Sequence, residues 1–179
     1  MTEAEYKQAI QLLDWDGLRQ LWRTIQQRIT PPGWAAGKSF EYAVLRAFEL
    51  DGATVRYPFT VVLEGQTVEQ VDGAVHIGAL SCLVEAKDYV AAINFEPVAK
   101  LRSQLLRRPA ATIGSVFTTS SFTAPALTLA KFLAPQTILL WEAAHFGYAL
   151  QHERISDLFV RKYQWCAETG EPDFDVTLL

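Results

Sequence analysis

The sequence predicts an α/β fold in which a mixed β-sheet is flanked by helices. Three observations support this fold class. Helix-like and strand-like segments alternate in the second half of the chain, strand-like segments follow one another in the middle, and apolar residues recur at helical spacing near both ends. The chain has 179 residues, half of them hydrophobic, which is enough for one domain with a core of its own.

The N-terminal region is predicted to be helical over residues 3–29, where apolar side chains recur at roughly helical spacing. Residues 14–17 interrupt this pattern, so we expect two short helices with Asp16 as a cap. The Thr-Pro-Pro-Gly sequence at residues 30–33 ends the region. The next helix is expected to begin with Ser39 as its N-cap and to end at the Asp-Gly pair of residues 51–52.

Three strands are predicted next, because β-branched and aromatic residues dominate and turn-forming residues separate them. We expect an antiparallel meander of Ala53 to Val62, Thr67 to His76 and Leu80 to Lys87. The second half alternates helices and buried strands. The expected elements are a helix from Pro97 to Arg108, a strand from Thr112 to Thr118, a helix from Ala124 to Leu133, a strand from Thr137 to Trp141 and a closing helix from Arg154 to Ala167.

The overall charge is mildly acidic, with a net charge of −4 and a pI of about 5.4. This balance counts against a surface that binds nucleic acid everywhere, but it allows a local basic patch. The polar N-terminus is unlike a secretory signal, and the apolar runs are too short to span a bilayer. Two distant cysteines, Cys82 and Cys166, are expected to be reduced. We therefore expect a cytoplasmic protein with no membrane partner.

Two acids and a lysine are the strongest candidates for chemistry. Glu85 and Lys87 alternate along one strand, so their side chains lie on the same face. A turn near Gly78 places Asp72, from the preceding strand, close to Glu85. Carboxylates of this kind suit Mg²⁺, with Mn²⁺ as a substitute, while a lysine beside them can orient water or neutralise charge in a transition state.

These residues resemble the PD-(D/E)XK nuclease superfamily. Val71-Asp72-Gly73 is followed by a hydrophobic strand that ends in Val84-Glu85-Ala86-Lys87, although Val71 stands where the proline of the family name is expected. The helix that opens with Gly37-Lys38-Ser39-Phe40-Glu41 is similar to one in Mrr-like restriction endonucleases, and so are residues 114–119 and 138–141. The resemblance implies that Glu41 is a further acid at the metal site.

The resemblance divides the chain into three parts: a helical extension over residues 1–36, a nuclease-like core over residues 37–146, and a helix and tail over residues 147–179. It implies a metal-dependent endonuclease that hydrolyses phosphodiester bonds in DNA, in restriction or defence. Cleavage of two strands needs two sites, so a symmetric homodimer is a reasonable hypothesis.

A basic stretch after the motif is a candidate for contact with nucleic acid. Positive side chains there can bind phosphates, and related nucleases often place a polar residue of this helix toward the site. The candidates are Lys100, Arg102, Gln104, Arg107 and Arg108. Each has the alternative of an ordinary solvated side chain.

Other functions stay open at this point. The same fold can serve as a non-catalytic nucleic-acid-binding or assembly module, and the charges can belong to the surface of a structural domain. RNA is an alternative substrate, because no base-reading motif is visible in the sequence.

Overall fold

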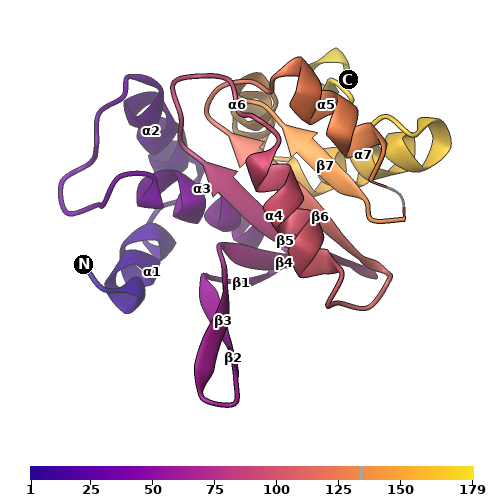
Figure 1. Ribbon diagram of the computed structural model, residues 1–179. Coiled ribbons are helices and arrows are strands. Elements are labelled where there is room, and N and C mark those ends of the chain that lie inside the picture. The colour runs from indigo at the N-terminus through magenta and orange to yellow at the C-terminus, as the bar shows by residue number, and fades with distance from the viewer. Residues whose placement is uncertain (134) are drawn as a thin grey trace.

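The structure, a computed structural model, describes residues 1–133 and 135–179. A mixed sheet lies between two layers of helices (Figure 1). The helices are α1 (Glu3–Gln11), α2 (Trp15–Gln26), α3 (Lys38–Leu50), α4 (Glu96–Leu105), α5 (Ala124–Lys131), α6 (Ala143–His152), α7 (Ile155–Thr169) and the short 3-10 helix η1 (Val176–Leu178). The strands are β1 (Thr54–Arg56), β2 (Phe59–Leu63), β3 (Gln66–Val71), β4 (Gly73–Ile77), β5 (Leu80–Lys87), β6 (Thr112–Thr118) and β7 (Ile138–Trp141).

The main sheet has the strand order β1-β4-β5-β6-β7. Strand β4 is antiparallel to both β1 and β5, whereas β5, β6 and β7 run parallel to one another. Helices connect the parallel strands, as such connections require. The predicted fold class, a mixed sheet flanked by helices with an αβββαβ core, is confirmed.

Each face of the sheet packs against its own hydrophobic cluster. Helices α1, α2, α3, α6 and α7 cover one face, where Cys82 and Val84 point. Helices α4 and α5 cover the other face, where Leu83 points. Side chains alternate along a strand, so Glu85 points with Leu83 toward α4.

Two glycines allow a helix to approach each face closely. A Cβ at residue 73 would lie 2.5 Å from Cδ2 of the buried Leu45 in α3, and a Cβ at residue 114 would lie 2.7 Å from Cδ2 of Leu101 in α4. Both positions therefore favour glycine. They bring α3 and α4 close to the sheet on either side of β5.

The predicted three-strand meander is wrong in its details. The first predicted strand is divided between β1 and β2, because the segment contains Pro58, which has no backbone N–H for a ladder. The second is divided at Asp72 into β3 and β4. Strands β2 and β3 form a separate hairpin that projects from the main sheet (Figure 1).

Smaller corrections concern the helices. The N-cap of α2 is Asp14, whose side chain accepts a hydrogen bond from the Gly17 N–H, and Asp16 lies in the first turn. Gly37 in the left-handed conformation precedes α3, so Ser39 lies inside that helix rather than capping it. Helix α6 was not predicted. None of the helices within the described residues has the length and apolar composition needed to cross a membrane.

Candidate active site

Asp72 lies at the break between β3 and β4, beside the end of β5. The next residue, Gly73, pairs with Val84 in the antiparallel ladder, so Asp72 stands next to Glu85 and Ala86. Its Oδ2 accepts a hydrogen bond of 3.0 Å from the Ala86 N–H. This bond fixes the carboxylate beside the C-terminal end of β5, where the chain returns from the β2–β3 hairpin.

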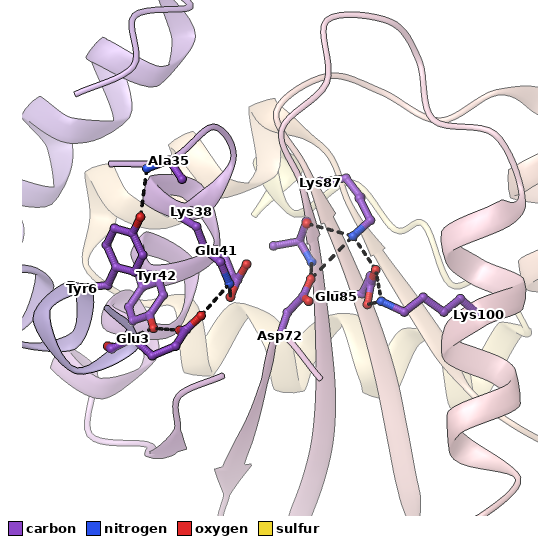
Figure 2. Close-up of polar contacts among 11 residues, drawn as sticks. Glu3, Tyr6, Ala35, Lys38, Glu41, Tyr42, Asp72, Glu85, Lys87 and Lys100 are labelled. Atoms are coloured by element: carbon purple, nitrogen blue, oxygen red, sulfur yellow. Dashed lines mark hydrogen bonds and ion pairs between the residues drawn. The ribbon is translucent and has the colours of Figure 1, made fainter. Parts of the chain in front are cut away.

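Lys87 contacts the carboxylates of both Asp72 and Glu85. Its Nζ lies 3.6 Å from Asp72 Oδ2 and forms an ion pair with Glu85 Oε1 (Figure 2). Burial favours the neutral amine, but the two nearby carboxylates outweigh this effect and raise the pKa of Lys87. The three residues predicted from the strand pattern therefore meet around one positive charge.

Glu85 has a second cationic partner, Lys100 of α4. The side chain of Glu85 is fully buried, and Lys100 Nζ donates to both of its carboxylate oxygens at 2.8 Å. From the sequence, Lys100 was expected only to contact nucleic acid. Gln104, for which the sequence predicted a contact with nucleic acid, lies one turn later on α4. Gln104 is buried, and its Nε2 donates to the Gln70 carbonyl at 3.1 Å.

Glu41 lies apart from this cluster, on α3, but faces the same region. Its Oε1 accepts from Lys38 Nζ at 2.8 Å. Burial raises the pKa of Glu41 to about 7, the charge of Asp72 adds to the rise, and Lys38 opposes it. A cavity of about 280 Å³ separates α3 from the end of β5, and its lining includes Glu41, Asp72 and Lys87.

A larger cavity lies on the α4 side of the same strand end. It has a volume of about 640 Å³ and is lined by Glu85, Lys87 and Lys100, together with residues 88–94 of the loop after β5 and the first residues of α4. Lys87 lines both cavities. The candidate site is therefore open on two sides, with Asp72 facing the smaller cavity and Glu85 facing the larger one.

The rest of the predicted basic stretch lies elsewhere. Arg107 and Arg108 form ion pairs with the carboxylate of Glu69 in β3, so they contact the β2–β3 hairpin and not the carboxylates of the candidate site. Arg102 is exposed on α4. Asp88, which follows the motif, accepts from Arg28 Nη1 at 2.8 Å.

The donor set suits a small, hard cation. Among residues 1–133 and 135–179, no group of three or more His, Cys, Asp or Glu side chains is arranged to hold a metal ion. Mg²⁺, however, is commonly held by one or two carboxylates, with water and substrate phosphate as the other ligands. Asp72 and Glu85 both lie against the Lys87 ammonium, which shows that one positive charge can interact with both.

Comparison with known families and structures gives consistent results. The family model Mrr_cat, described as a restriction endonuclease, matches residues 35–149. No curated protein matches the sequence. The DNA modification-dependent restriction endonuclease AspBHI is 19% identical with a TM-score of 0.52, over 92% of this chain and 42% of that chain. The small subunit of the heterodimeric restriction endonuclease R.BspD6I is 12% identical with a TM-score of 0.51, over 86% and 94%.

A protein of unknown function, AF1548, is 14% identical with a TM-score of 0.46, over 68% of this chain and 58% of that chain. This chain thus spans 58% of AF1548 and 42% of AspBHI. At these identities the structural similarities to AspBHI and the R.BspD6I subunit concern the fold alone.

Proposed function

The chain belongs to the family of Mrr-type restriction endonuclease catalytic domains, and from this premise we propose that it is a metal-dependent endonuclease that hydrolyses phosphodiester bonds in DNA. The observation that supports the proposal most strongly is the position of Lys87 Nζ between the carboxylates of Asp72 and Glu85. Two carboxylates and a cation that line two neighbouring cavities are groups that metal-dependent hydrolysis of a phosphodiester can use.

In this proposal Asp72 and Glu85 hold a divalent cation, Mg²⁺ or Mn²⁺, and Glu41 assists from across the smaller cavity. The cation supplies Lewis-acid activation of the phosphodiester and of the attacking water. Lys87 orients that water and neutralises the negative charge that develops on the phosphoryl oxygens. The hydrogen bond from the Ala86 N–H keeps Asp72 in place during the reaction.

DNA is proposed as the substrate, in restriction or defence, because of the family to which the chain belongs. A symmetric dimer would supply two sites for the two strands. Two free cysteines, Cys82 and Cys166, fit the reducing cytoplasm that we propose as its location.

Cleavage of supercoiled plasmid DNA tests the proposal. We expect nicking with Mg²⁺ or Mn²⁺, and a rate at least about 100-fold lower in Asp72→Asn and Lys87→Met, because each removes a group that stabilises the transition state. Asn keeps an oxygen that can accept from the Ala86 N–H, so Asp72→Asn should fold. The matched controls are Asp157→Asn and Lys131→Met, which change exposed ion pairs outside both cavities.

Three outcomes would contradict the proposal. Wild-type cleavage rates in both site variants would remove the mechanism. Cleavage of labelled RNA but not DNA would replace the substrate. Binding of DNA without cleavage under either metal would favour the alternative, a non-catalytic nucleic-acid-binding module of the same fold.

A further inference from the structure

The carboxylate of Glu85 has two cationic partners. It is fully buried, and it contacts the ammonium groups of both Lys87 and Lys100 (Figure 2). Lys87 also interacts with Asp72, whereas Lys100 interacts with Glu85 alone among the acids of the described residues.

Lys100 occupies the oxygens through which Glu85 would bind a metal ion. Its Nζ lies 2.8 Å from both Oε1 and Oε2, so it occupies the position from which one cation contacts both oxygens. An ammonium and a divalent cation cannot occupy the same position against these oxygens. A metal ion that binds both oxygens of Glu85 therefore requires Lys100 to move.

The Lys100 side chain has space to move away from Glu85. Its side chain is 44% exposed, compared with 21% for Lys87, so it leaves the carboxylate more easily. It belongs to the lining of the larger cavity, and among the described residues that line this cavity only Lys87 and Lys100 are positively charged. A lysine on its flexible four-carbon stem can turn from Glu85 into this space.

We propose that Lys100 is a displaceable cation that neutralises Glu85 when no metal is bound, gives way to the metal, and then binds a phosphate of the substrate strand in the larger cavity. This inference rests on the proposed function. The displacement makes metal and nucleic acid bind cooperatively. Metal binding frees the Lys100 ammonium from Glu85, and the free ammonium can then bind a phosphate of the substrate. Lys100 thereby gains a role in substrate binding that is distinct from the role of Lys87.

Calorimetric titration with Mg²⁺ or Mn²⁺, without nucleic acid, tests the displacement. Lys100→Met should bind the ion several-fold more tightly than the wild type, because the competing ammonium is gone. Lys100→Arg keeps a cation that can bind both carboxylate oxygens, so it should bind the ion no more tightly than the wild type. Lys131→Met, which removes an ammonium from Glu171 on the surface, is the matched control and should leave metal affinity unchanged.

Binding of a DNA duplex in Ca²⁺, measured over a range of salt concentrations, tests the phosphate contact. Lys100→Met should bind more weakly and lower the slope of log affinity against log salt by about 1, as expected for the loss of one phosphate contact. The Lys131→Met slope should equal that of the wild type.

An unchanged metal affinity in Lys100→Met would overturn the displacement, and an unchanged salt slope would overturn the phosphate contact. If the enzyme still cleaves DNA with Mg²⁺, either of these results would leave the proposed function intact and would remove the corresponding part of the role proposed for Lys100. A wild-type protein that binds no metal ion would overturn both the proposed function and the role of Lys100.

Discussion

At the scale of single residues, Lys162 is a fully buried lysine that lies outside the candidate site. Lys162 of α7 donates to the Phe174 carbonyl, lies 3.4 Å from His145 Nδ1, and has its Nζ 5.4 Å from the centre of the Trp141 ring. Burial lowers the pKa of Lys162 to about 7, and nearby carboxylates oppose this effect only in part. These carboxylates belong to Asp173, Asp175 and Glu142.

The lowered pKa predicts how stability depends on pH. Between a pKa of about 7 in the folded protein and the ordinary value of 10.5, the unfolded chain binds a proton that the native Lys162 does not. The free energy of unfolding is therefore higher near pH 10, where the native Lys162 is neutral, and it decreases as the pH falls toward about 7. Lys162→Met should raise the melting temperature relative to the wild type near pH 6, and this advantage should shrink near pH 10.

Thermal unfolding at the two pH values, followed by circular dichroism, checks this expectation. Lys131→Met, at an exposed position, serves as the control and should show no such difference. A change in melting temperature of the same size at both pH values in Lys162→Met would contradict a lowered pKa of Lys162.

The candidate site was partly predictable from single residues. Alternation along β5 was enough to put Glu85 and Lys87 on one face, and the turn at Gly78 was enough to bring Asp72 beside them. The partner on α4 was not predictable. Lys100 and Gln104 are four residues apart and share a face of the helix, and only the tertiary approach of α4 decides which one reaches Glu85.

At the scale of elements, three polar contacts connect the β2–β3 hairpin to the C-terminal end of α4 and the residues just after it. The carboxylate of Glu69 in β3 forms ion pairs with Arg107 and Arg108, just beyond the end of α4. Nearby, Gln104 Nε2 donates to the Gln70 carbonyl. Since β3 leads directly to Asp72 and α4 contains Lys100, these contacts join the two sides of the candidate site.

Glu69→Gln should loosen the hairpin while leaving the main sheet intact. The substitution removes the charge from a nearly buried carboxylate that has two arginine partners, which should cost about 1–3 kcal/mol of local stability. We expect faster hydrogen exchange in β2 and β3 and unchanged exchange in β5 and β6, measured by mass spectrometry.

Glu64→Gln at the exposed hairpin turn makes the same chemical change without an ion pair among the described residues, and it should leave exchange in the hairpin unchanged. Equal exchange in the hairpin of the wild type and Glu69→Gln would contradict the fastening role.

The elements differed in how well the sequence specified them. The buried strands β5 and β6 were predicted with their observed bounds, because apolar runs flanked by turn residues define such strands well. The division at Asp72 was not predicted, since an alternating pattern continues through it and only the pairing partners change, from β2 before Asp72 to β1 and β5 after it. Helix α6 follows β7 after a single residue, so no turn signal separates them.

At the scale of the whole molecule, the N-terminal helices share a hydrophobic core with the rest of the chain. Tyr6 and Ile10 of α1 and Leu18 and Ile25 of α2 belong to the same cluster as α3, α6 and α7. The division of the chain at residue 36, into a helical extension and a nuclease-like core, stays a prediction. In the folded molecule, the helices before it are continuous with the core.

This shared core predicts one cooperative unfolding transition in scanning calorimetry, with equal calorimetric and van't Hoff enthalpies. Removal of residues 1–36 should lower the melting temperature strongly, because it uncovers the apolar surface of Tyr42 and Phe40. Two separated transitions in the intact chain would contradict the expectation.

The hairpin also leaves and rejoins the main sheet at neighbouring points, since Arg56 at the end of β1 pairs with Ala74 in β4. When the ends of an excursion are already held together, doubling its length adds only about 0.6 kcal/mol of closure entropy. An arm of another length or sequence can therefore replace residues 60–68 without rebuilding the strands beneath it, provided that Glu69 and Gln70 keep their contacts and Asp72 stays at the point of return. The architecture separates a part of the chain that is free to diversify from the part that is tied to chemistry.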